Sequence, residues 1–211
     1  MNGYNEKTLI YKNVKVMRKI FFVLIFIQLF LSSFSMNSDY NSTEEKLNNQ
    51  VEEVKKIISD NPKYNKEIAF FIDMEIQSGK NRFFIYDLKN NKIIDEGLVA
   101  HGSGSETGIP GKLKFSNVAN SLSTSLGKYS IGNHYNGQFG KAYKLYGLDK
   151  TNNNAFGRSI VLHKFWAVPY EEQDKNICTS YGCPMVNETY FSRIEKIIDN
   201  SKTNIILSIY Y

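Results

Sequence analysis

The chain has 211 residues, 22% of them charged, and a formal net charge of +5. Residues 1–35 contain five Lys or Arg and one Glu, a net of +4, so residues 36–211 carry only +1. A nucleic-acid-binding domain needs a clustered basic face, and this nearly neutral remainder excludes that class of function.

The first segment, residues 1–35, is predicted to be a secretory signal peptide. Its apolar run, residues 20–31, follows four basic residues and is shorter than the ~20 residues that a membrane-spanning helix needs. Small polar residues come next, and their spacing predicts cleavage near Ser35. The alternative is an uncleaved signal anchor. A cleaved signal predicts an exported protein of the periplasm or cell envelope, with no stable membrane span.

A helical segment is predicted next, at residues 36–66. Ser42 and Glu45 have the spacing of a capping box, and Pro62 ends the segment. The apolar residues between them recur at helical spacing: Leu47, Val51, Val54 and Ile58.

The remaining residues, 67–211, are predicted to form one mainly β domain. Apolar patterns typical of strands occur at residues 67–75, 82–88, 92–100, 127–135, 139–149, 158–163 and 203–211. The first three strands are joined by short polar turns, which predicts an antiparallel meander. Asn136-Gly137 is a strong hairpin signal. Residues 188–200 are predicted to form an amphipathic helix near the C-terminus.

A segment rich in Gly, Ser and Thr, residues 101–125, has no apolar period and is predicted to be one long loop. Loops of this length inside compact domains are usually functional. His101 opens the loop at the end of a strand. It is either a loop histidine bonded to backbone or a cleft residue near Cys183.

The two cysteines of the chain, Cys178 and Cys183, lie in the stretch "ICTSYGCPMVN". Their spacing does not match that of a structural zinc site, and the chain has only three histidines, so we predict no metal. A disulfide between them is compatible with export, but so short a loop would gain little stability from it. The third interpretation is a catalytic nucleophile with a bystander thiol.

Nucleophilic catalysis needs a thiolate, a base and donors for an oxyanion. His163 ends the predicted strand "RSIVLH", where it could take the proton of Cys183 and lower the pKa of that thiol. Gly182 lets the backbone approach closely, so the amides of Tyr181, Gly182 and Cys183 could converge on one oxygen.

These residues resemble a known signature. "LH" at 162–163, sixteen residues and then "SYGC" at 180–183 resemble the His-x(14–17)-[Ser/Thr]-x-Gly-Cys motif of the YkuD-type L,D-transpeptidase catalytic domain. The stretches "RFFIYDLKNNKII", "GLVAHGSGS", "TSLGKYSIG", "GRSIVLHKFWAV" and "GCP" resemble the murein L,D-transpeptidase catalytic-domain-like branch of that family. The likeness covers about residues 67–190.

The resemblance implies a β-sandwich that performs cysteine-dependent acyl transfer on peptidoglycan stem peptides, through a thioester acyl-enzyme. It implies that Cys183 is the nucleophile, that His163 is the base, and that Ser180 and Gly182 position the thiol and the oxyanion hole. It implies no metal or organic cofactor. Two alternatives stay open: an L,D-carboxypeptidase that uses the same site, and a non-catalytic envelope protein that binds peptidoglycan.

The chain departs from the common family motif at three places. After the cysteine the common motif has a hydrophobic residue and then Asn or Arg, whereas this chain has Pro184-Met185, as in the branch named above. Tyr181 stands where the common motif has His, and Lys164 stands where the branch often has Gly, which changes the shape or charge of the cleft. Three residues are predicted to bind substrate: His101, Tyr181 and Trp166. The alternative for Trp166 is a place in the core or at the rim. Cys178 is either a bystander or a partner that can oxidise Cys183.

Overall fold

The computed structural model describes residues 43–211, so the predicted signal peptide and the Ser42 cap lie outside the described residues. Asn49–Tyr211 form one compact unit, and residues 43–48, the start of a helix, belong to the preceding unit. None of the described helices is both long and apolar enough to cross a membrane.

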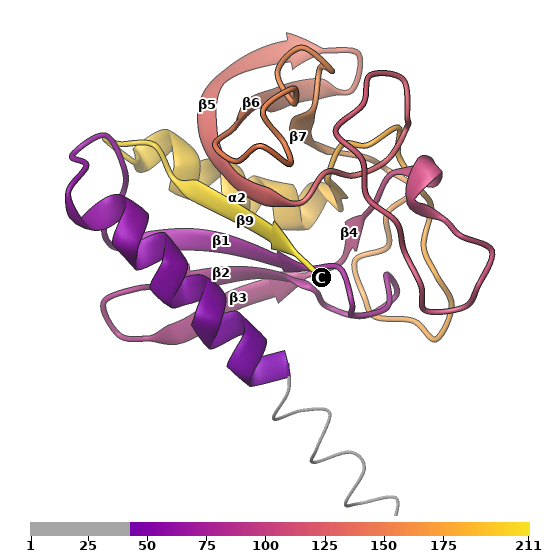
Figure 1. Ribbon diagram of the computed structural model, residues 1–211, viewed down its shortest axis with the longest axis horizontal. Coiled ribbons are helices and arrows are strands. Elements are labelled where there is room, and N and C mark those ends of the chain that lie inside the picture. The colour runs from indigo at the N-terminus through magenta and orange to yellow at the C-terminus, as the bar shows by residue number, and fades with distance from the viewer. Residues whose placement is uncertain (1–42) are drawn as a thin grey trace, which may run out of the picture. The chain divides into compact units, whose positions relative to one another are not determined.

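Within residues 43–211, nine strands form a single sheet. Figure 1 shows how the strands that it labels are arranged. In chain order they are β1 (Ile68–Asp73), β2 (Phe83–Asp87), β3 (Lys92–Gly97), β4 (Val99–Ala100), β5 (Gly127–Gly137), β6 (Gly140–Gly147), β7 (Val161–Lys164), β8 (Met185–Val186) and β9 (Ile206–Tyr210). Their order across the sheet is β3-β2-β1-β9-β5-β6-β7-β8-β4. The mainly β fold predicted from the sequence is confirmed.

The sheet nearly closes on itself. β3 and β4 stand at its two opposite ends, yet only Leu98 separates them in the chain. The two edges must therefore come together at this residue, which is almost fully buried at 1% exposure. A sheet curled in this way is consistent with the predicted β-sandwich.

The strand pairing confirms the meander and corrects one predicted strand. β1 pairs antiparallel with β2, and β2 with β3. The predicted strand at 92–100 is two strands, because its last two residues leave β2 and pair with β8 at the other edge of the sheet. β8 has only two residues, too few to show an apolar alternation in the sequence.

The hairpin between β5 and β6 turns later than predicted. Gly137 pairs with Gly140, so the turn residues are Gln138 and Phe139 rather than Asn136-Gly137. Gly140 has a φ of +84°, the left-handed conformation that closes the turn. The shift places a phenylalanine at the hairpin tip.

The segment at 101–125 is a loop with one short 3-10 helix, η1 (Ser103–Ser105). Gly104 allows two parts of this loop to touch, because a Cβ there would lie 1.9 Å from the carbonyl oxygen of Ser121. The long loop is thus folded on itself.

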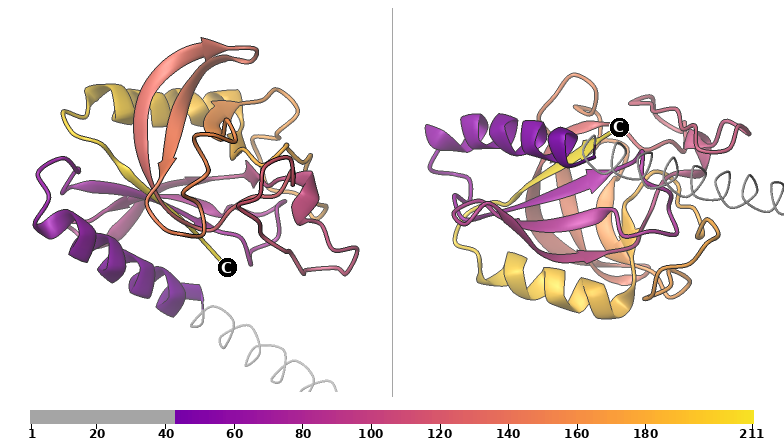
Figure 2. Two further views of the ribbon diagram at one scale, coloured as in Figure 1. Left: turned by 45° about the horizontal axis from the view of Figure 1, so that its top comes forward. Right: turned by 90° about the horizontal axis from the view of Figure 1, so that it is seen from below.

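Two helices cover opposite faces of the sheet, as Figure 2 shows. In the first, of which residues 49–59 belong to this unit, the predicted core positions Val51, Val54 and Ile58 are buried, and the hydroxyl of Ser208 in β9 donates to Gln50 at 2.8 Å. The second is α2 (Glu188–Asn200), as predicted.

α2 packs on the sheet through aromatic residues. Asn187 caps it by accepting from the amide of Thr189 at 2.8 Å. The ring of Tyr190 meets Phe83 of β2 edge-on, with centroids 5.5 Å apart, and its hydroxyl donates to the Phe83 carbonyl at 3.0 Å. Because α2 directly follows β8, this packing fixes the short segment that carries the candidate nucleophile.

Candidate active site

The turn that carries the cysteine, residues 180–183, is held against the start of the long loop. The amide of Ser180 donates to the carbonyl of His101 at 2.8 Å, and the amide of Ser103 donates to the Ser180 carbonyl at 2.7 Å. The Ser180 hydroxyl accepts from the amide of Gly182 at 3.0 Å. The predicted motif residues Ser180 and Gly182 therefore lie together and shape one turn, which we call the cysteine turn.

Gly182 occupies a position that only glycine fits well. Its φ is +116°, and a Cβ there would lie 2.9 Å from the carbonyl oxygen of Ser123 and 3.0 Å from Cδ1 of Ile160. The motif glycine thus brings the backbone before Cys183 close to both the long loop and the approach to β7.

The thiol of Cys183 lies beside the segment that leads into β7. Its Sγ accepts from the amide of Val161 at 3.4 Å and donates to the carbonyl of Ser159 at 3.7 Å. Burial raises the pKa of the Cys183 thiol, while the Val161 amide and the charge of Arg158 act to lower it. At neutral pH the thiol is therefore protonated and needs a base before it can attack.

His163 has the properties of such a base. Its Nδ1 lies 2.9 Å from the carbonyl oxygen of Lys164. A carbonyl only accepts, so Nδ1 carries the hydrogen and Nε2 keeps a free lone pair. Burial lowers the pKa of His163, with the bond to Lys164 opposing, so the ring is neutral at pH 7.

Strand pairing places His163 beside the segment that follows Cys183. β7 and β8 run parallel with His163 opposite Met185, and the His163 amide donates to the Pro184 carbonyl at 3.4 Å. Cys183 is thus two residues before the strand partner of the histidine. Within residues 43–211 the thiol bonds to Val161 and Ser159, and no hydrogen bond joins it to the imidazole in this conformation.

The oxyanion donors differ from the three amides predicted. The amide of Gly182 already donates to Ser180, so it is not free to bind an oxygen. Tyr181 and Cys183 have amides without a hydrogen-bond partner among the described residues. The candidate oxyanion hole therefore has two backbone donors, one on each side of the glycine.

An aromatic row runs from the imidazole to the surface. The ring of Phe139, at the β5–β6 hairpin tip, stacks on His163 and meets Phe165 edge-on at 5.3 Å. Phe165 contacts Trp166 at 5.6 Å between centroids. Trp166 is 79% exposed, so the interpretation of a core residue is wrong. Tyr181, in the cysteine turn, is equally exposed.

His101 joins the site through its backbone, while its side chain faces elsewhere. Nη2 of Arg82 lies 2.9 Å from Nδ1 of His101, and Nε2 of His101 lies 2.8 Å from a Glu106 carboxylate oxygen. Arginine only donates, so Nδ1 accepts and Nε2–H donates. These three side chains line a pocket of about 540 Å³, separate from the cysteine. The ring of His101 bonds to side chains, so the alternative of a histidine bonded to backbone is wrong, and the pocket that the ring lines does not include Cys183.

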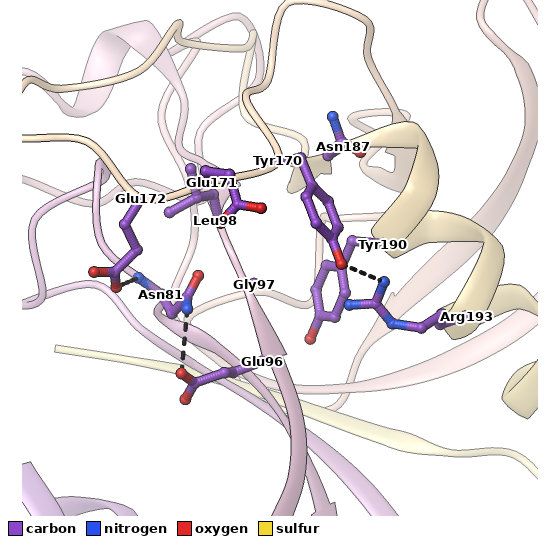
Figure 3. Close-up of a pocket in the computed structure, with 10 residues that line it drawn as sticks. All are labelled: Asn81, Glu96, Gly97, Leu98, Tyr170, Glu171, Glu172, Asn187, Tyr190 and Arg193. Atoms are coloured by element: carbon purple, nitrogen blue, oxygen red, sulfur yellow. Dashed lines mark hydrogen bonds between the residues drawn. The ribbon is translucent and has the colours of Figure 1, made fainter.

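A second pocket, of about 510 Å³, lies between the end of β3 and the start of α2 (Figure 3). Three carboxylates line it: Glu96, Glu171 and Glu172. The guanidinium of Arg193 lies between the rings of Tyr170 and Tyr190, 5.6 and 5.1 Å from their centroids. Neither Cys183 nor His163 lines this pocket, so it is distinct from the candidate site.

The described residues contain neither a group of metal ligands nor a disulfide. Within residues 43–211, no three His, Cys, Asp or Glu side chains are grouped as metal ligands. Cys178 and Cys183 are both free thiols, and both pack against one small apolar cluster that includes Met185. The site thus offers a thiol, a neutral imidazole and backbone donors.

Comparison with known proteins gives the family. The family model of the L,D-transpeptidase catalytic domain matches residues 38–210. The chain belongs to the L,D-transpeptidase catalytic domain family. No curated protein matches its sequence.

Two solved structures are among those similar to this chain. An L,D-transpeptidase from Xylanimonas cellulosilytica is 12% identical, with 71% of this chain and 63% of that chain covered and a TM-score of 0.37. The helical cell shape determining protein Pgp2 from Campylobacter jejuni is 11% identical, with 68% and 47% covered and a TM-score of 0.45. This L,D-transpeptidase-family chain therefore spans less than two thirds of either structure's length.

Three groups of this L,D-transpeptidase domain contribute to the site although the sequence assigned them no role. They are the carbonyl of Lys164, which orients His163, the ring of Phe139 and the guanidinium of Arg158. The ammonium of Lys164, expected to alter the cleft, pairs with Glu188 at 2.9 Å. Arg158 belongs to the quoted stretch "GRSIVLHKFWAV", whereas no sequence signal points to a hairpin-tip phenylalanine.

Proposed function

We propose that the protein is an exported L,D-transpeptidase that acts on peptidoglycan stem peptides, with Cys183 as nucleophile and His163 as base. One observation carries the proposal. A neutral imidazole with Nδ1–H bound to Lys164 stands on the strand paired with the segment that follows the thiol. Family membership supports the same reaction class.

The first half-reaction forms a thioester. Nε2 of His163 takes the proton of the Cys183 thiol, and Sγ attacks the carbonyl carbon of an L-residue whose amide bond leads to a D-residue. The resulting oxyanion is stabilised by the amides of Tyr181 and Cys183. The imidazolium gives its proton to the departing amine of the D-residue, and the carbon–nitrogen bond breaks.

The second half-reaction transfers the acyl group. An amine of a neighbouring stem attacks the thioester carbonyl and passes a proton to Nε2 of His163. The carbon–sulfur bond then breaks, and the proton returns to the sulfur of Cys183. The thiol must exchange its contacts with Val161 and Ser159 for the imidazole, since catalytic hydrogen bonds often tighten only when substrate is bound.

The other site residues have supporting roles in this proposal. Ser180 and Gly182 hold the cysteine turn in the shape that aims the two amides. Trp166 and Tyr181, both largely exposed beside the reacting groups in the chain, contact the sugar or peptide of the substrate. His101 supports the turn through its carbonyl, because both of its ring nitrogens already have partners.

Purified stem peptides test the reaction directly. We expect cross-linked dimers, identified by mass, from the unmodified protein and from Cys178→Ala, and none from Cys183→Ala. The two cysteine variants are matched, because each removes one of the chain's two thiols. Trimmed monomers without dimers would make the protein a carboxypeptidase, and no product from the unmodified protein would favour a non-catalytic binder.

Intact-mass analysis with a carbapenem tests the nucleophile without a peptide substrate. We expect one covalent adduct on the unmodified protein and on Cys178→Ala, and no adduct on Cys183→Ala. An adduct that persists in Cys183→Ala would place the reactive group elsewhere.

A further inference from the structure

Arg158 binds residues 116–125, the serine-rich half of the long loop, through a set of hydrogen bonds that we call the clasp. It stands in the turn before β7, and its guanidinium donates four hydrogen bonds, all to residues 116–125. The acceptors are the Ser116 carbonyl at 2.8 Å, the Ser125 hydroxyl at 3.3 Å, the Ser121 hydroxyl at 3.2 Å and the Ser123 carbonyl at 2.6 Å. A lysine ammonium could not span these acceptors, because it lacks the planar fork of donors.

The same guanidinium lies against the cysteine turn. A Cβ added at Gly182 would be 3.4 Å from Nη2 of Arg158 and 2.9 Å from the Ser123 carbonyl that this Nη2 binds. The residue after the arginine, Ser159, supplies the carbonyl that faces the Cys183 thiol. The clasp therefore joins the long loop, the turn before β7 and the backbone next to the sulfur.

The charge of Arg158 is not cancelled by its own contacts. All four acceptors are neutral, and no salt bridge within residues 43–211 involves this side chain. The titratable groups that interact with it are Tyr129 and Cys183. As long as the imidazole of His163 is neutral, Arg158 is the cation within residues 43–211 whose charge acts on the sulfur of Cys183.

We propose that Arg158 is a positioning residue that holds residues 116–125 against the cysteine turn and stabilises the thiolate of Cys183. This inference rests on the proposed function only in taking Cys183 as the nucleophile. The guanidinium acts through space on the sulfur and touches no reacting atom. Its two effects, the clasp and the charge, are separable by substitution.

The test titrates a single thiol. In a Cys178→Ser background, the rate of Cys183 alkylation by iodoacetamide is followed against pH for the parent and for two Arg158 variants. Arg158→Gln, which removes the charge, is expected to slow alkylation at pH 8 about tenfold and to move the profile to higher pH. Arg158→Lys, which keeps the charge, is expected to leave the profile near that of the parent.

Amide hydrogen exchange in residues 116–125 measures whether Arg158 holds this part of the loop in place. Both Arg158 variants are expected to exchange faster in residues 116–125, because neither can bind all four acceptors. Lys150→Gln is the matched control, since it removes one exposed positive charge from the same turn and should change neither readout. If Arg158→Gln does not fold, Arg158→Lys by itself tests the proposal. This variant must then keep the pH profile of alkylation of the parent and still exchange faster in residues 116–125.

An unchanged profile in Arg158→Gln, or an equal shift in both variants, would overturn the charge assignment. Unchanged exchange in residues 116–125 would overturn the clasp. Alkylation needs a thiol and no peptidoglycan, so these results are independent of turnover. If Arg158→Gln shifts the pH profile of alkylation but the unmodified protein makes no product from stem peptides, the proposed function is wrong and the inference about Arg158 still holds.

Discussion

The ring of Phe139 lies on the imidazole of His163, with centroids 5.2 Å apart and 14° between the planes. The phenylalanine is at the tip of the β5–β6 hairpin and is itself 44% exposed, whereas the histidine is only 5% exposed. One face of the imidazole is therefore kept from water by a side chain on a surface turn.

Phe139→Ala is expected to raise the pKa of His163 toward its ordinary value, because burial is what lowers it. The acid limb of a pH–rate profile should move to higher pH, since the base must be neutral. Stability should fall by about 1 kcal/mol, the usual worth of one aromatic pair. Proton NMR of the ring hydrogens measures the pKa, with His163→Gln assigning the signal among the three histidines. An unchanged titration in Phe139→Ala would contradict the shielding role.

Gly182→Ala is expected to cost about 2 kcal/mol or more and to abolish thiol positioning. Alanine is strained at a φ of +116°, and its Cβ would lie 2.9 Å from the Ser123 carbonyl. Gly157→Ala is the matched control, because a Cβ there meets only the Asn154 carbonyl at 3.6 Å. Urea unfolding and iodoacetamide reactivity measure the two effects. Equal behaviour of the two variants would show that the turn does not need a glycine.

Arg82→Met is expected to destabilise the protein strongly. The side chain is 1% exposed, and it donates to the carbonyls of Val99 and Ile76 and to His101. Removing it leaves these buried acceptors without donors, at a cost of about 3 kcal/mol, or a Tm about 9 °C lower. Lys80→Met removes an exposed cation from the same chain region and should change Tm by no more than about 2 °C.

Stability is expected to fall as the pH falls from 7.5 to 5.5. Burial lowers the pKa of His101, aided by the charge of Arg82, and burial lowers the pKa of His163. Below about pH 6.5 the unfolded chain therefore binds protons at these two histidines that the folded protein does not. The stability that the two histidines contribute is complete above that pH and is progressively lost below it. Carboxyl groups titrate near pH 4 and lie outside this window.

Urea unfolding at the two pH values measures the loss. His101→Gln should lower stability at pH 7.5 but reduce the difference between pH 7.5 and 5.5, because one of the two buried imidazoles is gone. Equal stability of the unmodified protein at both values would mean that neither buried histidine resists protonation.

The sequence by itself determined the local features of this protein. The helical spacing of Val51, Val54 and Ile58 gives a helix with these residues buried, and the polar turns after β1 and β2 give an antiparallel meander. Each of these follows from residues close together in the chain, where side-chain periodicity and turn chemistry act. The proposed pair of His163 and Cys183 comes from a spacing motif that resembles the family signature.

Only the tertiary structure decided how distant segments meet around that pair. No periodicity shows that the strand at 92–100 divides at Leu98 to close the sheet, or that Phe139 covers the imidazole. The direction of the His101 side chain depends in part on Arg82, 19 positions away in the chain, and the clasp of Arg158 depends on acceptors 33 to 42 positions away. Such contacts arise from packing between strands, and a single sequence carries no local signal of which surfaces will face each other.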